Sequence, residues 1–137
     1  MKREVVREAA ALGIAERVLF TGFLRGEELD KIYQAADVLL MPSVSEPFGI
    51  VALEALVNGT PAVLSKQSGV SERLRHALKV DFWDVAETAN KIIAMLRYAS
   101  LRACLAEEGG KEARQCNWQE SARECMRVYD GCIAERT

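Results

Sequence analysis

The sequence predicts an α/β protein in which a Rossmann-like parallel sheet is covered by helices on both faces. Short, wholly apolar runs alternate along the chain with stretches whose apolar residues repeat at helical spacing. The apolar runs lack the polar alternation of half-exposed strands, which is typical of strands buried on both faces. Such alternation of strands and helices favours right-handed βαβ units. The 137 residues are enough for one domain, 1–137, around a single core.

The first part of the chain contains two predicted helix–strand pairs. Residues 3–12 have the spacing of a helix, and residues 18–21 (VLFT) form a short buried strand that ends at Gly22. Residues 27–36 place their apolar side chains on one helical face. The apolar run 38–41 is then the second strand, because Pro42 ends it.

Two further strand–helix units follow. Residues 50–57 form a helix, and residues 61–64 a strand whose proline occupies the permitted first position. A short helix is expected at 71–75 and a weaker strand at 78–82. From about residue 84 onward every predicted element is a helix.

This helical C-terminal segment begins at a capping box, Asp84-Val-Ala-Glu87, which opens a helix through Tyr98. Ser100 is expected to cap the next helix, with Gly109-Gly110 ending it. A further capping box at Asn117 starts the terminal helix. Its apolar face is expected to be buried and to include the following residues: Trp118, Ala122, Cys125, Met126, Tyr129 and Cys132.

Composition excludes several classes of protein. The net charge is −2 and no basic run dominates a face, so a nucleic-acid partner is not expected. No apolar stretch approaches the roughly 20 residues of a transmembrane helix, and the N-terminus lacks the apolar core of a secretory signal, so a cytoplasmic location is expected. The four cysteines form no CxxC pair and only His76 could join them, so they are interpreted as buried structural thiols, with no metal site and no cofactor.

One segment has the character of a binding site. In parallel α/β sheets, ligands bind beyond the carboxyl ends of the strands, and residues 42–49 lead from a strand end into a helix. The start of that helix presents free amides near Phe48, Gly49 and Ile50, together with the positive end of the helix dipole. Glu46 stands before the first turn, and Glu54 can reach back over it. Carboxylates that accept from hydroxyls beside amides that donate to phosphate would suit a ligand containing sugar and phosphate.

The same segment resembles a known family. Residues 46–54 (EPFGIVALE), followed by ALVNGTPAV, are similar to the E-x7-E segment of retaining GT-B glycosyltransferases, the group that includes glycogen and sucrose synthases. Residues 18–23 (VLFTGF), the helix that ends in YQAAD, and Asn117-Trp118 before the last helix support the match. The resemblance covers nearly the whole chain and implies the C-terminal, donor-binding domain of such an enzyme.

The resemblance implies specific roles. Glu46 would be the catalytic residue that contacts donor-sugar hydroxyls near the reacting carbon, and Glu54 would bind the ribose hydroxyls. The amides of Phe48 and Gly49 would hold the sugar and those of Ile50 and Val51 the phosphates, while Gly22, Phe23 and Leu24 would lie against the nucleobase. The implied ligand is a nucleotide sugar with a UDP, GDP or ADP group. The implied reaction is transfer with retention at the anomeric carbon, without a required metal.

The chain also departs from the family pattern. It begins after the counterparts of two βα units, which in the family carry a Gly-Arg pair and a Lys that neutralise the diphosphate. The acceptor-binding N-terminal domain has no counterpart either, so the chain corresponds to a partial GT-B C-terminal domain. Lys66 and Arg25 could replace the missing cations but are interpreted as solvated surface charges. Strand 18–21 should either move beside strand 38–41 or meet a partner chain, because an empty gap would leave buried backbone groups unpaired.

Three functions remain open from the sequence. The chain could be the donor-binding part of a glycosyltransferase that is completed by a second chain or by a missing N-terminal domain. It could instead be a binding or regulatory module without catalysis, or a fragment without a function of its own. Whether it is an enzyme therefore stays open. Alone, it is expected to bind a nucleoside diphosphate weakly, if at all, and to transfer no sugar, because the cations that a diphosphate needs are missing.

Overall fold

A computed structural model describes residues 2–134 and contains the predicted parallel sheet. The strands are β1 (Leu39–Met41), β2 (Ala62–Ser65) and β3 (Leu78–Val80). They lie in the order β1-β2-β3, and both neighbouring pairs are parallel, with Leu39 opposite Ala62 and Val63 opposite Leu78. The carboxyl ends of the three strands therefore meet at one edge of the sheet, as the sequence predicts.

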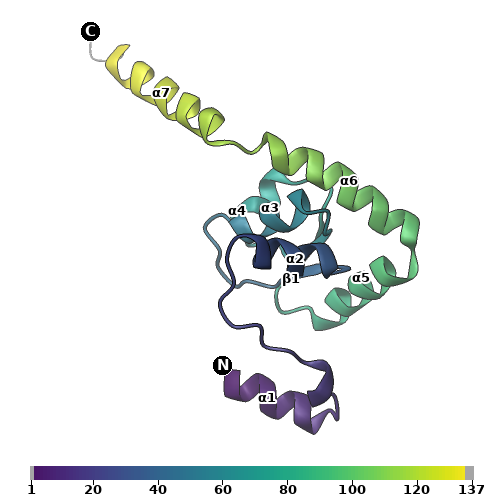
Figure 1. Ribbon diagram of the computed structural model, residues 1–137. Coiled ribbons are helices and arrows are strands. Elements are labelled where there is room, and N and C mark those ends of the chain that lie inside the picture. Colours follow the sequence, from purple (N-terminus) through teal and green to yellow (C-terminus); the bar gives the residue numbers. More distant parts are fainter. Residues whose placement is uncertain (1, 135–137) are drawn as a thin grey trace.

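Helices make up most of the remaining described chain. Their order along the sequence can be followed by colour in Figure 1. The helices are α1 (Lys2–Ala11), the 3-10 helix η1 (Ala15–Arg17), α2 (Glu27–Ala35), α3 (Ile50–Val57), α4 (Gly69–Arg73), α5 (Val85–Arg97), α6 (Ala99–Gln115) and α7 (Trp118–Ala134). None of them, within residues 2–134, is both long and apolar enough to cross a membrane.

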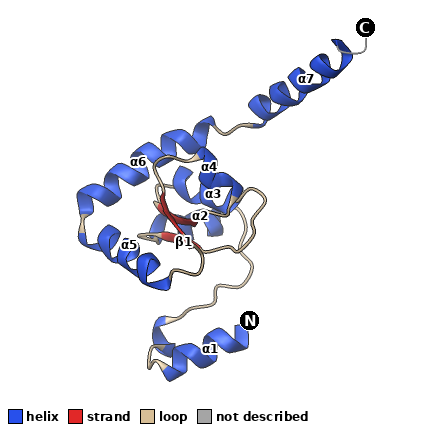
Figure 2. Cartoon of the chain, turned by 180° about the vertical axis from the view of Figure 1, so that it is seen from behind, coloured by secondary structure: helices blue, strands red, loops and turns tan. Residues whose placement is uncertain are grey.

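The core lies on both faces of the sheet, which is seen between its helices in Figure 2. Alternate residues of β2 point to opposite faces. Ala62 and Leu64 pack with Leu56 of α3 and with Val70 of α4. Val63 packs on the other face with a second group of apolar side chains from α5, α6 and β3. All four residues of β2 are buried, which explains why its sequence shows no polar alternation.

The predicted strand at 18–21 does not form. Residues 18–21 are irregular and pair with none of the described strands, and Leu19 is 83% exposed. Of the two alternatives for this segment, the one in which it moves beside β1 is therefore wrong, and pairing with a partner chain stays a prediction. The physical reason is the absence of a neighbouring strand, since extended residues become a strand only through hydrogen bonds to a partner. The segment runs outside the body toward α1, which lies apart from the sheet in both ribbon views (Figures 1 and 2).

The predicted end of α6 at Gly109-Gly110 is also wrong, because the helix continues to Gln115. Both glycines are buried where α6 crosses α3. A Cβ atom on Gly109 would lie 2.7 Å from Leu56 Cδ2, and one on Gly110 would lie 3.0 Å from the Leu56 carbonyl oxygen. These glycines therefore allow two helices to approach closely rather than ending one of them.

Two of the three predicted helix caps are present. Asp84 Oδ1 accepts from the amide of Glu87 at 2.9 Å, and Asn117 Oδ1 accepts from the amide of Glu120 at 2.9 Å. Ser100, by contrast, lies inside α6, whose preceding residue is Tyr98. Tyr98 makes no side-chain capping bond, so the prediction for this helix start is wrong.

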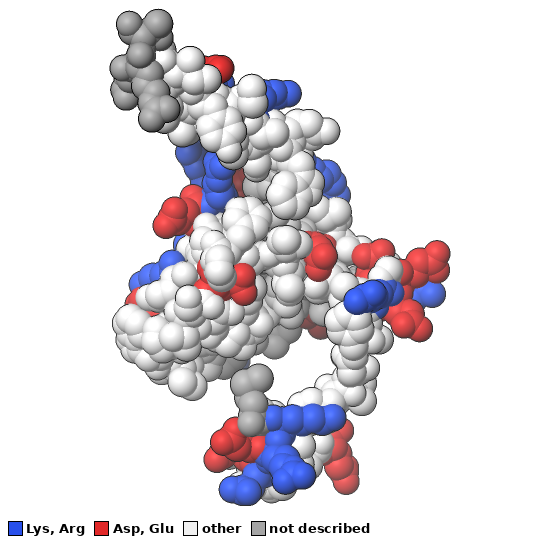
Figure 3. Space-filling view, turned by 90° about the vertical axis from the view of Figure 1, so that its left-hand side faces the viewer, with Lys and Arg blue, Asp and Glu red and all other residues white. Residues whose placement is uncertain are grey.

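The terminal helix extends away from the body, so its apolar face is not buried (Figure 1). Trp118, expected in the core, is 83% exposed. The interpretation of the cysteines as buried thiols is also wrong, because Cys104, Cys125 and Cys132 are exposed and Cys116 is half-buried. On the face shown in Figure 3, charged side chains of both signs gather on α1, while much of the central body is uncharged.

Candidate functional site

The candidate site begins in the loop that connects β1 to α3. Gly49 precedes the first residue of α3 and has φ 102°, in the left-handed region that favours glycine. It is also tightly surrounded, because an added Cβ would lie 2.9 Å from both Met41 Cε and Val70 Cγ1. The sequence interpretation gave this glycine a ligand-binding amide. The structure shows in addition that glycine is required here by the backbone and by the core.

The loop that precedes α3 is fixed by the loop before α4. Glu46 and Ser68 form an isolated parallel bridge, in which the Gly69 amide donates to the Glu46 carbonyl at 3.0 Å. The Val70 amide donates to the Phe48 carbonyl at 2.6 Å. A Cβ on Gly69 would overlap the Pro47 carbonyl oxygen. The amides of residues 68–71 all have backbone acceptors, so this loop adds no further free amides beside α3.

The first amides of α3 lack backbone acceptors in the described part of the chain, although Gly49 itself is buried. Within residues 2–134, no backbone carbonyl accepts from the amides of Phe48, Gly49, Ile50 or Val51. This is expected at a helix N-terminus, where the first N–H groups lack intrahelical acceptors. Because these donors also lie at the positive end of the helix dipole, they favour an anionic ligand.

Glu54 lies one turn further along α3, on the side that faces α2. Its Oε2 atom accepts from the hydroxyl of Tyr33 at 3.2 Å. The Tyr33 side chain is buried, and burial together with the negative charge and hydrogen bond of Glu54 raises the pKa of this phenol to about 12. The phenol is thus held neutral as a donor, which fixes one oxygen of the Glu54 carboxylate.

The other predicted site residues fall into two groups. Glu46 is half-buried beside the start of α3, with its Cγ atom 3.4 Å from the position of a Cβ on Gly49. Gly22, Phe23 and Leu24 lie in the irregular segment before α2, where Gly22 has φ 74° and Phe23 is 80% exposed. The guanidinium of Arg25 stacks 4.6 Å from the centre of the Phe23 ring.

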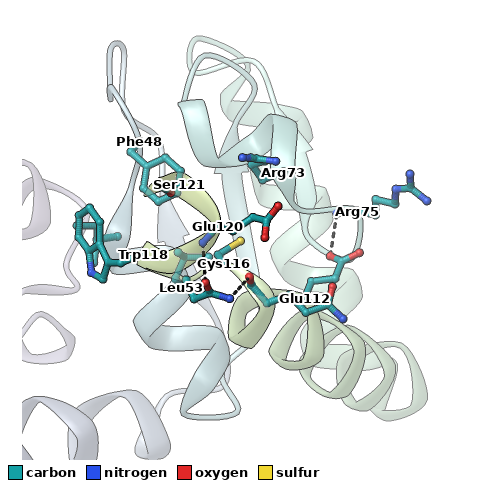
Figure 4. Close-up of a pocket in the computed structure, with 12 residues that line it drawn as sticks. Phe48, Leu53, Arg73, Arg75, Glu112, Cys116, Trp118, Glu120 and Ser121 are labelled. Carbon is teal, nitrogen blue, oxygen red and sulfur yellow. Dashed lines mark hydrogen bonds between the residues drawn. The ribbon is translucent and has the colours of Figure 1, made fainter. Parts of the chain in front are cut away.

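A cavity of about 780 Å³ adjoins the start of α3. Figure 4 shows its aromatic side chains, Phe48 and Trp118, with Arg73 and Glu112 on other walls. The structure thus brings Phe48 and Ile50 to this cavity, but Glu46 and Glu54 are not among its lining residues. The cavity lies between α3, α4 and the α6–α7 junction.

Lys66 and Arg25 make contacts within the chain. Lys66 follows β2, and its Nζ lies 2.7 Å from Asp81 Oδ2, just beyond β3. Hydrogen bonding and charge attraction from Asp81 raise the pKa of Lys66, while the hydrogen bond from Lys66 lowers the pKa of Asp81. With Arg25 stacked on Phe23, both cations have a partner at the protein surface. This agrees with their interpretation as surface charges.

Glu112 of α6 forms hydrogen bonds with the loop between α4 and β3. Its Oε2 atom accepts from the amides of Arg75 and His76 at 2.8 and 3.0 Å, and its Oε1 lies 2.9 Å from His76 Nδ1. Burial acts to raise the pKa of Glu112, but these hydrogen bonds and the nearby imidazole outweigh it and lower the pKa below its usual range. This partner of His76 is 36 residues away in sequence, and no local pattern indicates it.

Comparison with known proteins identifies the family. The model of the family "Glycosyl transferases group 1" matches residues 1–112, which is more than half of the chain. The chain belongs to this glycosyltransferase family. Among similar proteins, D-inositol 3-phosphate glycosyltransferase of Salinispora tropica is 36% identical over 134 residues. An uncharacterized glycosyltransferase of Methanocaldococcus jannaschii is 36% identical over 123 residues.

These relatives are much longer than the chain. The matched residues cover 96% and 86% of the glycosyltransferase chain described here, but only 28% and 31% of the two relatives. The activities of these relatives therefore belong to proteins of which this chain matches less than a third.

Solved structures give the same fold. Sucrose-phosphate synthase from Thermosynechococcus elongatus superimposes with a TM-score of 0.81 at 29% identity, covering 97% of this chain and 34% of that one. Anabaena HepE, solved in complex with UDP and glucose, has a TM-score of 0.77 at 27% identity, covering 82% and 31%. The C-terminal domain of a group 1 glycosyltransferase from Francisella tularensis has a TM-score of 0.75 at 23% identity, covering 84% and 61%, and supports the fold alone. The chain thus has the fold of a GT-B C-terminal domain.

Proposed function

We propose that the chain is the donor-binding domain of a retaining glycosyltransferase and that the start of α3 binds the nucleotide sugar. The observation that carries this proposal is the conformation of Gly49. It turns the chain from β1 directly into α3, so that four amides without backbone acceptors open the helix beside Glu46. In a chain of this family, such an anion-binding helix start at the carboxyl edge of a parallel sheet supports a phosphate-containing donor.

Each ligand group has a residue to receive it. The amides of Phe48 to Val51 donate to sugar and phosphate oxygens, and Glu46 accepts from donor-sugar hydroxyls. Glu54 accepts from the ribose, since only its Oε2 atom has a partner within the described residues. The base would lie against Gly22, the exposed Phe23 and the half-buried Leu24. The complex of HepE with UDP and glucose makes UDP the first nucleotide to test.

The protein is proposed to be inactive as this chain alone. Acceptor binding and additional phosphate-neutralising cations would come from a second chain or from a further domain, in a cytoplasmic setting. A second candidate is a sugar-nucleotide-binding module without catalysis. The ion pair between Lys66 and Asp81 favours it, because it neutralises a cation at the sheet edge that could otherwise stabilise the phosphates. Sugar transfer upon addition of an N-terminal domain of a related enzyme would distinguish the first candidate from the second.

Calorimetry with nucleoside diphosphates and sugar nucleotides tests the binding proposal. The chain should bind these ligands weakly. Glu54→Gln should lower the affinity for every nucleotide, because a charged acceptor contributes about 1.5–3 kcal/mol per hydrogen bond. Glu46→Gln should lower the affinity only for the sugar nucleotides and leave that for the free diphosphates unchanged. Glu8→Gln, at an exposed position of α1, is the matched control and should change neither the affinity for diphosphates nor that for sugar nucleotides. Binding that is insensitive to both site substitutions would place the pocket elsewhere, and sugar transfer by the purified chain alone would refute the assignment of the missing half.

A further inference from the structure

Tyr33 is a buried polar side chain at the candidate site to which the sequence interpretation gave no role. Its side chain lies between α2 and α3, 7% exposed, and its hydroxyl reaches Glu54 Oε2 at 3.2 Å. A buried hydroxyl needs an acceptor, and this one is satisfied by a carboxylate 21 residues away on another helix. The contact therefore couples the position of α2 to the orientation of the Glu54 side chain.

The Tyr33 backbone is held as firmly as its ring. The Thr60 hydroxyl, buried between α3 and β2, donates to the Tyr33 carbonyl, and the Ala36 amide donates to the same oxygen at 2.9 Å. A second set of bonds joins the same two helices. Asn58 donates to Asp30 Oδ1 at 3.1 Å and accepts from Gln34 at 3.0 Å. The phenol thus projects from a fixed support, as a residue that orients another side chain must.

We propose that Tyr33 is a positioning residue that orients the Glu54 carboxylate for the ribose diol of a nucleotide donor, an inference that rests on the proposed function. Tyr33 itself does not contact the ligand. By holding Oε2 it restricts rotation of the carboxylate and leaves Oε1 to accept from the ribose hydroxyls. Pre-orienting a flexible glutamate reduces the side-chain entropy that would otherwise be lost when the ligand binds.

Tyr33→Phe in the full 137-residue chain tests this, because it keeps the buried ring and removes only the hydroxyl. Binding of UDP and of 2′,3′-dideoxy-UDP is measured by titration for the wild type, Tyr33→Phe, Glu54→Gln and the double variant. UDP affinity should fall about three- to tenfold in Tyr33→Phe. Affinity for the dideoxy nucleotide should change less than about twofold, since the lost hydrogen bond acts only through the ribose hydroxyls. Tyr98→Phe, which alters an exposed tyrosine, is the control.

The double variant identifies the route of the effect. If Tyr33 acts through Glu54, the loss in the double variant should equal that in Glu54→Gln alone. Additive losses, an equal loss for both nucleotides, or an unchanged UDP affinity in Tyr33→Phe would each overturn the inference. The last result would leave the proposed function intact. Absence of any UDP, GDP or ADP binding by the wild type would instead refute the proposed function, and this inference with it.

Discussion

The loss of unfolding free energy in Gly49→Ala measures how much the fold depends on glycine at the start of α3. Gly49→Ala places a Cβ at φ 102°, where a side chain costs about 1–2 kcal/mol. The same Cβ meets Met41 and Val70 at 2.9 Å, and overpacking of this kind costs about 1–3 kcal/mol. The sum is a destabilisation of about 2–5 kcal/mol, or a fall in Tm of roughly 6–15 °C at about 3 °C per kcal/mol.

Two other glycines separate these contributions. Gly59 has φ 87° but nothing within 4 Å of an added Cβ, so Gly59→Ala should cost only the conformational part, about 1–2 kcal/mol. Gly131 lies in α7, also in open space and without a positive φ, so Gly131→Ala should stabilise by up to about 1 kcal/mol. Urea and thermal unfolding followed by circular dichroism measure all three. Equal effects of Gly49→Ala and Gly59→Ala would refute the packing argument, and a neutral Gly49→Ala would refute both arguments.

Two further predictions follow from the shifted pKa values. The pKa of Tyr33 is raised, so its neutral form is favoured by folding, and the stability that it contributes is present below pH 10 and lost as pH rises through about 12. The absorbance titration of the wild type minus that of Tyr33→Phe should show a phenol ionising near pH 12, and at lower pH in Glu54→Gln; a midpoint near 10 would contradict the contact. The pKa of Glu112 is lowered, so its contribution is present above pH 4.5 and lost as pH falls below it. The stability advantage of wild type over Glu112→Gln in urea unfolding should therefore shrink on acidification, and an advantage that grew would refute the assigned sign.

The central part of the fold could be predicted because its sequence signals are local. The apolar runs at β1 and β2, the bounds of α3 and the caps at Asp84 and Asn117 each depend on a few neighbouring residues. Strand 18–21 has an equally good apolar run, but a strand also needs a neighbour to pair with, and none of the described strands provides one.

Gly109-Gly110 shows the opposite limit. Glycine next to a helix end and glycine at a helix crossing look alike in sequence, and only the contact with Leu56 distinguishes them. Trp118 was assigned to the core because helical periodicity identifies an apolar face but does not reveal what covers it. The same limit applies to the cysteines of α7, which share that face.

The candidate site was partly accessible from sequence. The strand-to-helix turn could be predicted from the order of apolar runs, whereas the left-handed backbone that requires glycine at position 49 was shown only by the structure. The partners of Glu54 and His76 could not, because Tyr33 and Glu112 lie 21 and 36 residues away and meet them only through packing of the helices. The roles of all the predicted site residues stay predictions, namely those of Glu46, Phe48, Gly49, Ile50, Val51, Glu54, Gly22, Phe23 and Leu24.

Amide chemical shifts during a UDP titration test most directly whether α3 begins at the nucleotide site. The account predicts that, in 15N-labelled chain, the largest saturable shifts with UDP fall on Ile50 and Val51, and that a UDP-sugar adds shifts at Phe48 and Gly49. None of these four amides has a backbone acceptor among the described residues. Glu54→Gln should reduce the affinity derived from these shifts. Shifts that cluster instead around Arg73 and Trp118, at the neighbouring cavity, would contradict the account, as would the absence of any saturable shift.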